Sequence, residues 1–383
     1  MPSTARTTAT STGTSTAPDA DHPAVAGLEL RPLTFPTTLE DTDPHAADFL
    51  AMVDVRNEIH RVISGHDDHC FPAAELLPHY APQPWEIRRM WLVLLDGVPV
   101  GRIGVDLPLE GAQTLALFFI DLHPDVWGRG IGTTALDLVE RTAREHGRTM
   151  LQTYVEHPEV PGPRLPAPTG FGSVPAEASN VRFLLKHGFV LEQIERNSVL
   201  DLTAPADGVE RLLAQARERS ADYRTVSWFA PTPPEHVAGY AWLKSRMATD
   251  VPAAELEVPE EVWDAERVAV HDERYTSVGR ILHVVAAQHI ATGELCGFNE
   301  LVIGVDRTGA SHQEDTLVLK EHRGHRLGML VKCENLLRWR EIAPDSPRVM
   351  TYNAEENRPM LDINEELGFV PIAYEGAWQK QLD

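Results

Sequence analysis

Residues 311–340 of the chain read SHQEDTLVLKEHRGHRLGMLVKCENLLRWR and predict a strand, a tight basic turn and a helix in succession. The β-branched and apolar run at 316–319 is typical of a strand, and from Leu327 onward the apolar residues recur with the period of a helix. Between them, residues 322–328 (HRGHRLG) place small and basic side chains at a helix start, where backbone N–H groups lack partners inside the helix. Such a turn is suited to binding a phosphate.

An earlier segment repeats this plan. Residues 115–122 form an apolar, strand-like run, and residues 127–132 (WGRGIG) lead into an amphipathic helix. Gly147 is the expected end of that helix, because glycine readily adopts the left-handed conformation that closes helices. Two copies of strand, anion-binding turn and helix in one chain predict a duplicated domain.

The two turns resemble the pyrophosphate-binding loop of the GNAT superfamily of N-acetyltransferases. The pattern of that loop is Arg or Gln, two residues, Gly, one residue, then Gly or Ala. The first copy keeps Gly130 and Gly132 but has Trp127 at the leading position. The second copy keeps Arg323 and Gly328 but has an arginine, residue 326, where a glycine is usual.

Each copy also contains the Gly-Phe pair that ends the fourth helix of the GNAT fold, in residues 183–189 (FLLKHGF) and 363–369 (INEELGF). Asn353 and Asn357 precede the second pair and are also typical of the family. The resemblance spans residues 28–383 and implies an α/β fold, with a mixed sheet in each of two consecutive GNAT-like acyl-CoA N-acyltransferase domains. The arrangement is similar to that of mycothiol synthase, another tandem GNAT protein.

The predicted domain organisation has four parts. Residues 1–27 are rich in Thr, Ser and Ala and are expected to form a disordered tail. An N-terminal GNAT-like domain follows at 28–203, with a proline-rich insertion at 157–176 that is read as a flap or a brace between domains. A linker helix at 204–222 precedes the C-terminal GNAT-like domain at 223–383, and residues 259–275 are expected to form one of its helices.

The net charge, the cysteines and the lengths of the apolar runs indicate which binding partners and which cellular compartment to expect. The formal net charge of −23 disfavours nucleic acid and anionic lipid, and it favours cationic small molecules or simply solubility. The three cysteines, Cys70, Cys296 and Cys333, are too widely spaced to indicate a disulfide framework or a zinc finger, so the reducing cytoplasm is the expected compartment. No apolar run approaches the length of about 18 residues that a membrane span needs, and no secretion signal is recognised.

Residues 65–70 (GHDDHC) concentrate side chains that can bind metals, but their spacing does not match a standard site. A polar loop between helices explains them without metal, and no metal is expected. In the GNAT fold this region often lines the acceptor pocket, so the resemblance implies a role in substrate binding.

The resemblance also implies a mechanism: the acceptor amine attacks the thioester of acetyl-CoA directly, where the fourth and fifth strands part. A carboxylate on the fourth strand is the usual base, and a Tyr in the fourth helix often protonates the thiolate. Neither copy has that Tyr, because Leu184 and Asn364 occupy its position. The C-terminal copy is expected to be catalytic, through residues that carry acid or base groups: His312, Glu314, Asp315, Glu300 on the preceding strand, and Tyr352, or alternatively Tyr374, as the acid.

The residues expected to bind acetyl-CoA surround both turns. In the second copy they are Leu317, Val318, Leu319, Arg323, Gly324, His325, Arg326, Leu327, Gly328, Asn353 and Asn357. In the first copy they are Leu122, Trp127, Gly128, Arg129, Gly130, Ile131 and Gly132. The first copy has fewer acids on its fourth strand, so it is expected either to bind coenzyme A without turnover or to act as a scaffold.

The predicted function is acetyl-CoA-dependent N-acetylation of a small, cationic amine by a cytoplasmic monomer or homodimer that binds neither nucleic acid nor membrane. A preponderance of Arg over Lys is usual in high-GC bacteria and is compatible with antibiotic modification. One alternative is a catalytically silent acyl-CoA-binding module or sensor, which the missing Tyr favours. Another is a tandem GNAT-fold transferase that uses aminoacyl-tRNA, which the acidity disfavours.

Overall fold

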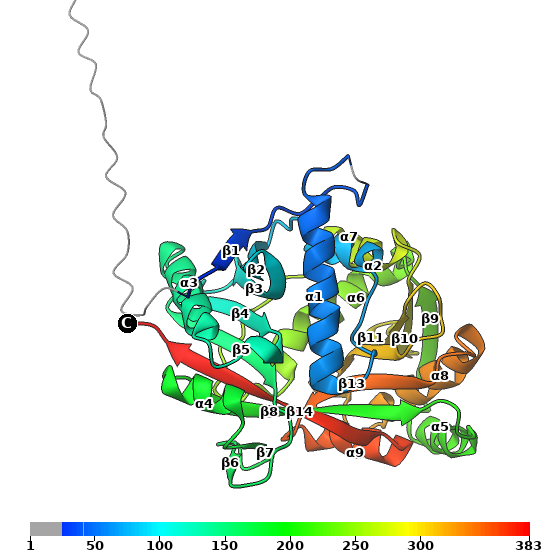
Figure 1. The fold of residues 1–383 in the computed structure, drawn as a ribbon. Coiled ribbons are helices and arrows are strands. Elements are labelled where there is room, and N and C mark those ends of the chain that lie inside the picture. The colour runs from blue at the N-terminus through cyan, green and yellow to red at the C-terminus, as the bar shows by residue number, and fades with distance from the viewer. Residues whose placement is uncertain (1–24, 41) are drawn as a thin grey trace, which may run out of the picture.

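The computed structural model describes residues 25–40 and 42–383, so most of the predicted disordered tail lies outside the described residues. Within them, one mixed sheet of 12 strands runs through both halves of the chain (Figure 1). Its strand order is β1-β2-β3-β4-β5-β14-β8-β13-β12-β11-β10-β9, and β6 and β7 form a separate hairpin. Helices cover both faces of the sheet.

The elements of the first half are β1 (Leu28–Pro32), α1 (Ala46–Ser64), α2 (Ala73–Leu76), η1 (Leu77–Tyr80), β2 (Glu86–Leu95), β3 (Val98–Pro108), β4 (Leu115–Leu122), η2 (Pro124–Val126), α3 (Ile131–Glu145), β5 (Met150–Glu156), β6 (Arg164–Pro166), β7 (Ser173–Pro175), α4 (Ser179–Lys186) and β8 (Val190–Asp201). The second half contains α5 (Asp207–Arg219), β9 (Tyr223–Phe229), α6 (Pro234–Asp250), α7 (Ala265–Thr276), β10 (Ile281–His289), β11 (Leu295–Ile303), β12 (Ser311–Val318), η3 (Lys320–His322), α8 (Leu327–Ile342), β13 (Arg348–Ala354), α9 (Arg358–Leu367) and β14 (Val370–Gln381).

Side chains alternate between the two faces of the sheet along each strand, and this alternation explains why helices pack on both faces. In β2, Leu92 and Leu94 pack against α1, whereas Val93 and Leu95 lie in the core that contains α3 and α4 on the opposite face. The second half repeats this arrangement, with α6 and α7 on one face and α5, α8 and α9 on the other. The duplicated α/β fold expected from the sequence is therefore present.

The two halves exchange their last strands. β14, at the end of the chain, pairs with β5 of the first half, and β8 pairs with β13 of the second half. Consequently Trp378 is fully buried in the core of the first half, while Leu200 lies in a core of the second half. The domain boundaries at 203 and 223 stay predictions, and each of the two predicted ranges contributes a strand to the partner half.

The structure differs from the sequence-based expectation at two places, the start of one helix and the proline-rich insertion. The helix predicted at 259–275 begins only at Ala265, because the side chain of Asp264 caps it by accepting from the backbone N–H of Arg267 at 2.9 Å. The proline-rich insertion at 157–176 contains the β6–β7 hairpin. No helix among the described residues is long and apolar enough to cross a membrane.

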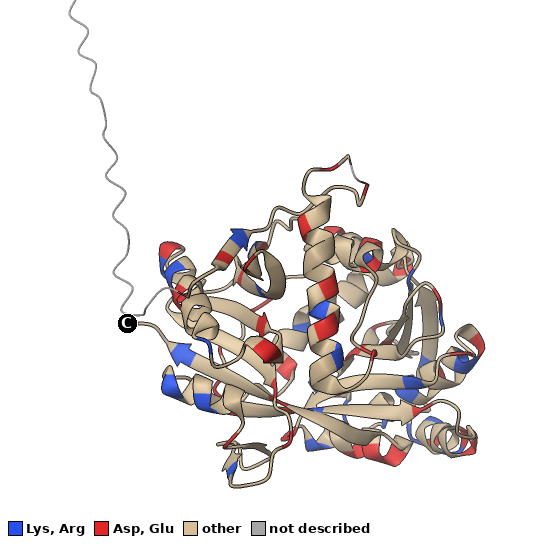
Figure 2. Ribbon diagram, in the orientation of Figure 1, with Lys and Arg blue, Asp and Glu red and all other residues tan. Residues whose placement is uncertain are grey.

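Acidic residues are spread over the helices and loops of both halves (Figure 2). Three of them meet where the strands are exchanged, since Glu375 of β14 is in register with Glu156 of β5 on one side and Glu195 of β8 on the other. Burial first, and then the carboxylates of Glu195 and Glu156, raise the pKa of Glu375 to about 8. Like charges directly opposite one another on neighbouring strands destabilise a sheet.

Substituting Glu375→Gln is therefore expected to stabilise the fold in a pH-dependent way. A carboxyl with a raised pKa in the folded state holds a proton that the unfolded chain releases, so the wild-type free energy of unfolding falls between about pH 4.5 and pH 8. Because Glu375 is only half-buried, we expect a gain of about 1–2 kcal/mol at pH 8, shrinking toward pH 5. Urea denaturation at both pH values measures it, with exposed Glu210→Gln as the control. An equal effect at both pH values would contradict a raised pKa of Glu375 in the folded state.

Candidate active site at the bulge of strand β12

Strand β12 carries a bulge that the corresponding strand of the first half lacks. Leu301 pairs with Gln313 and Asn299 pairs with Thr316, so two residues of β12 lie opposite Glu300 alone. Those two residues are the predicted site residues Glu314 and Asp315. In the first half, β3 and β4 pair without a shift in register. The bulge frees the backbone N–H of Asp315, which donates to Glu300 Oε2 at 3.4 Å.

The bulge lies where two parallel strands part. β12 pairs with β13 only at Ser311–Val349 and His312–Met350, and the bulge follows at once. In the first half, the parallel pairing of β4 with β5 covers residues 115–117 and 150–152. The parting of the fourth and fifth strands, expected from the sequence, is therefore found beside the predicted acids of the second copy.

Glu300 is fully buried behind the bulge, and helix α6 supplies its partners. The hydroxyl of Tyr240 donates to Glu300 Oε1, and Lys244 Nζ lies 3.3 Å from the same oxygen and 2.5 Å from Asp315 Oδ2. Burial raises the pKa of Glu300 to about 7, although Lys244 opposes the rise. Burial opposes the charge of Lys244, but Asp315 and Glu300 together raise its pKa. Glu300 thus positions the bulge from inside the protein.

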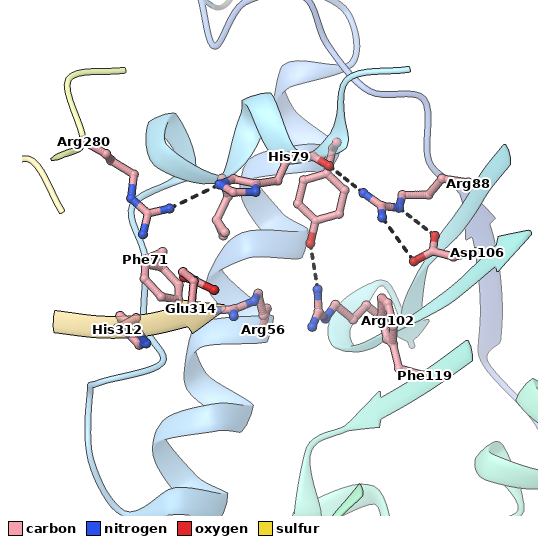
Figure 3. A pocket seen from close by; sticks show the side chains of 12 residues that line it. Arg56, Phe71, His79, Arg88, Arg102, Asp106, Phe119, Arg280, His312 and Glu314 are labelled. Atoms are coloured by element: carbon pink, nitrogen blue, oxygen red, sulfur yellow. Dashed lines mark hydrogen bonds and ion pairs between the residues drawn. The ribbon is translucent and has the colours of Figure 1, made fainter. Parts of the chain in front are cut away.

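Glu314 points into a cavity of about 330 Å³ between the two halves (Figure 3). The side chains that line this cavity come from both halves: Arg56, Phe71, Leu76, His79, Tyr80, Arg88, Arg102, Asp106, Phe119, Arg280, His312 and Glu314. The Glu314 side chain is accessible from the cavity but closely surrounded by protein. Burial, followed by the charge of Asp315, raises its pKa. A carboxyl with a raised pKa in a cavity is suited to general-base catalysis near neutral pH.

The other predicted catalytic residues are not gathered around Glu314. His312 lines the same cavity, and burial lowers its pKa to about 4, so it is neutral at pH 7. Asp315 lines a second cavity of about 560 Å³. The hydroxyl of Tyr352 lies 3.2 Å from His69 Nε2 and accepts from Asn197 at 3.0 Å, so Tyr352 is held in a packed cluster. The alternative acid Tyr374 packs against the core of the first half.

The polar stretch 65–70 joins the two halves. Arg348 of β13 donates to Asp68 at 3.0 Å, and His69 contacts Tyr352 as described above. Phe71, which follows the stretch, lines the cavity beside Glu314. The stretch therefore docks the segment after α1 onto the second half and places Phe71 at the candidate site.

Both predicted phosphate turns have the same backbone plan. Gly130 precedes α3 at φ 87°, and Arg326 precedes α8 at φ 56°, so arginine adopts the left-handed conformation that glycine supplies in the first copy. A Cβ added at Gly128 or at Gly324 would meet no atom within 4 Å among the described residues. The loop before each helix is therefore open, whereas a Cβ at Gly132 would lie 3.3 Å from Phe183 and one at Gly328 2.9 Å from Ile363. The first N–H groups of both helices have no acceptor inside the helix.

The side chains around the turns fall into two groups. Arg129, Arg323 and His325 are exposed, as phosphate ligands must be. Others are packed in apolar cores and can offer only their backbone: Leu122, Ile131, Leu317, Val318, Leu319 and Leu327. Trp127 ties the first turn to its strand, since its indole N–H donates to the carbonyl of Leu122 at 2.8 Å.

Asn364, at the position of the missing Tyr, has an unexpected partner. Its amide donates to Asn353 Oδ1 at 2.6 Å, and Lys332 Nζ of α8 donates to Asn364 Oδ1 at 2.6 Å. Lys332 is fully buried, and burial lowers its pKa to about 7. Asn357 precedes α9 as its N-cap residue. The pattern analysis missed Lys332, although a lysine inside the apolar run 329–333 is itself a signal.

The second cavity is predominantly acidic. It lies between the two halves and includes Tyr154 of β5, Gln193 of β8 and the segment that follows α6. Its charged lining residues are Glu86, Glu110, Glu195, Glu257, Glu261 and Asp315, against Arg88, Arg267 and Arg274. This charge is suited to a cationic group. Elsewhere, Glu294, Cys296 and His322 bring possible metal-ligand atoms within 4.8 Å of one another, although exposed carboxylates often group in this way without an ion.

Comparison with known proteins agrees with this fold. The sequence model of the Acetyltransferase (GNAT) family matches residues 58–162, which include the first phosphate turn. A tandem GNAT protein from the clavulanic acid biosynthesis pathway is 24% identical, with 92% of this chain and 98% of that chain covered and a TM-score of 0.67. A GCN5-related N-acetyltransferase from Sphaerobacter thermophilus is 14% identical, with 93% and 96% covered and a TM-score of 0.59. No curated protein matches the chain.

The matched family is one of acetyltransferases, which use acetyl-CoA, and its match lies in the first copy. The similarity to the tandem GNAT structure extends over both copies. Residues 58–162 thus match the Acetyltransferase (GNAT) family, and over nearly its whole length the chain has the fold of a tandem GNAT protein.

Proposed function

We propose that the chain is an acetyl-CoA-dependent N-acetyltransferase in which the second copy is catalytic and the acceptor amine enters the cavity beside Glu314. One observation carries this proposal. The bulge of β12 presents Glu314, a carboxyl with a raised pKa, to a cavity at the point where β12 and β13 part. The equivalent strand of the first copy has no bulge and offers Phe119 to the same cavity.

The chemistry needs little beyond positioning and one base. The amine nitrogen attacks the thioester carbonyl, a C–N bond forms, and the C–S bond breaks to release the thiolate. Glu314 accepts the proton that the amine loses, which is general-base catalysis. Lys332 holds Asn364 at the position of the missing Tyr by donating to its Oδ1, and the thiolate takes its proton from solvent. The phosphate turn of the second copy holds the diphosphate through backbone N–H groups.

A silent acyl-CoA-binding module is the second candidate. The absence of the Tyr favours it, since Leu184 and Asn364 occupy the two positions. Thiol release from acetyl-CoA across a panel of small amines, with mass spectrometry of the product, separates the candidates. We expect thiol release with formation of an N-acetyl product. Coenzyme binding in calorimetry without thiol release for any amine would favour the silent module.

The two phosphate turns are expected to contribute unequally to turnover. Gly328 and Gly132 are the second residues of α8 and α3, so proline at either position removes one N–H of the helix start. The added Cβ would lie 2.9 Å from Ile363 at position 328 and 3.3 Å from Phe183 at position 132, so a neighbouring side chain must shift as well. Loss of one charge-assisted hydrogen bond lowers affinity roughly 10- to 100-fold. We expect Gly328→Pro to lower kcat/KM for acetyl-CoA by about this factor, while Gly132→Pro retains most of the activity. The reverse ranking would assign catalysis to the first copy.

A further inference from the structure

The cavity beside Glu314 is unusually basic for this protein. Its basic lining residues come from four separate parts of the chain: Arg56, Arg88, Arg102 and Arg280 (Figure 3). Among the described residues, only two carboxylates, Asp106 and Glu314, line it. In a chain with a formal net charge of −23, a local excess of positive charge focuses the potential that attracts an anionic group.

Two of these arginines are neutralised by close carboxylates. Arg88 Nε donates to Asp106 Oδ1 at 2.6 Å, and its Nη2 donates to the second oxygen of Asp106 at 3.2 Å. Arg102 Nε donates to Asp121 Oδ2 at 2.8 Å. Both pairs lie across neighbouring strands of the first half and hold the cavity wall in place.

Arg56 has no such partner. It makes no ion pair with any residue in 25–40 or 42–383, and its hydrogen bonds to that part of the chain all leave from Nη1, to Asn57 Oδ1 at 2.8 Å and to the carbonyl of His69 at 2.6 Å. Nε and Nη2 therefore form an unused donor fork of the kind that binds a carboxylate through two parallel hydrogen bonds. Burial lowers the pKa of Arg56 to about 10, followed by the charge of Arg102. A bound anion would offset the free-energy cost of burying the charged guanidinium group of Arg56.

Arg280 and Arg56 both contact the ring of Phe71. The guanidinium carbons of Arg56 and Arg280 are each 5.4 Å from the centroid of the Phe71 ring. Arg280 Nη1 lies 3.2 Å from His79 Nε2, and burial lowers the pKa of His79 to about 3, so this neutral imidazole accepts from Arg280. A carboxylate oxygen of Glu75 is 3.4 Å from Arg280 Nε. Phe71 thus holds two guanidinium groups at the same cavity.

We propose that the acceptor is an amine that also carries a carboxylate, which the Nε and Nη2 groups of Arg56 bind with help from Arg280 while the amine faces Glu314. This inference rests on the proposed function for the role of the amine, but the anion site stands on its own contacts. A cavity of about 330 Å³ limits the acceptor to a small molecule. The cationic acceptor predicted from net charge is thereby refined to a zwitterion.

Matched acceptor pairs test the proposal. Thiol release is measured with β-alanine against propylamine and with γ-aminobutyrate against butylamine, and O-phosphoethanolamine tests a phosphate in place of the carboxylate. We expect kcat/KM to be at least about 10-fold higher for the aminocarboxylates, as one charge-assisted contact implies. Equal use of both members of each pair would overturn the proposal, and a preference for the phosphate would overturn its choice of carboxylate.

Substitutions at Arg56 test whether this residue binds the carboxylate of the acceptor. Arg56→Gln is expected to raise KM for the aminocarboxylates roughly 10- to 100-fold, with KM for acetyl-CoA unchanged. Arg56→Lys keeps the charge without the fork and should recover only part of the loss. Arg61→Gln is the control on the same helix, since Arg61 is exposed and pairs with Glu58 and Asp67. Arg280→Gln provides a second test if Arg56→Gln is poorly folded in a thermal melt.

Binding without turnover distinguishes this proposal from the proposed function. Calorimetry with succinate, which carries no amine, is expected to show binding to the wild type that Arg56→Gln weakens and Arg61→Gln does not. If no amine supports thiol release while succinate binding depends on Arg56, the anion site stands and the transferase proposal fails. If thiol release occurs but neither succinate binding nor KM depends on Arg56 or Arg280, the anion site is refuted and the transferase proposal stands.

Discussion

Replacing Glu314 with Gln is expected to lower kcat by a factor of about 10² to 10⁴, because general-base assistance contributes on that scale. Gln has nearly the same shape but cannot accept the proton of the attacking amine. Glu314 is accessible from the cavity beside β12, so its loss should leave the fold and the KM for acetyl-CoA largely unchanged. Steady-state thiol release measures both quantities. Glu341→Gln, on the exposed side of α8, is the control.

The pH profile separates a base from a merely structural carboxylate. Burial and Asp315 raise the pKa of Glu314, while Arg280 and Lys244 oppose the rise. Activity of the wild type should therefore fall as the pH drops through this raised pKa, since the protonated carboxyl cannot act as a base. The Glu314→Gln variant should lose this acidic limb. An acidic limb that persists unchanged in the variant would assign the base to another group, with Asp315 the next to test.

Replacing Trp378 with Ala is expected to lower the free energy of unfolding by about 3–5 kcal/mol, the usual cost of removing a fully buried large aromatic side chain. Trp378 lies on the exchanged strand β14, is fully buried in the core of the first half, and donates from its indole nitrogen to His157 Nε2 at 3.0 Å. Burial lowers the pKa of His157 to about 4, so its neutral imidazole accepts this bond near pH 7.

This substitution tests the strand exchange itself. In the exchanged arrangement, a change near the end of the chain removes packing from the core of the first half. Urea denaturation followed by fluorescence should show the loss, and we expect the sheet to unfold in one transition because it is continuous. Trp242→Ala, on the exposed side of α6, should cost less than about 1 kcal/mol. A similar small effect of Trp378→Ala would contradict the exchanged arrangement.

Local pattern was sufficient for most elements. The change of period at Leu327 correctly places the start of α8. The helix predicted at 259–275 was wrong at its start, because Asp264 provides the cap and the helix begins only after it. Glu314 and Asp315 stay predicted bases, implied by the resemblance to the GNAT fold through their place on the fourth strand, and no local signal in the sequence indicates that they form a bulge.

The charged residues of the cavity show where such reasoning stops. Arg56, Arg88 and Arg280 belong to segments far apart in the sequence, and each alone fits a solvated surface position. Their meeting in one cavity depends on the tertiary arrangement of the two halves. The buried Lys332 gave a local signal, whereas the unused donors of Arg56 depend on the distances around it.

The sequence by itself determined the duplicated strand, turn and helix, because the periodicity of apolar residues and the conformational needs of a helix start are local properties. Only the tertiary structure decided which half receives β8 and β14, and which side chains meet in the cavity between the halves. Strand pairing and the gathering of charges depend on contacts between residues far apart in the chain, and many pairings satisfy the same local pattern.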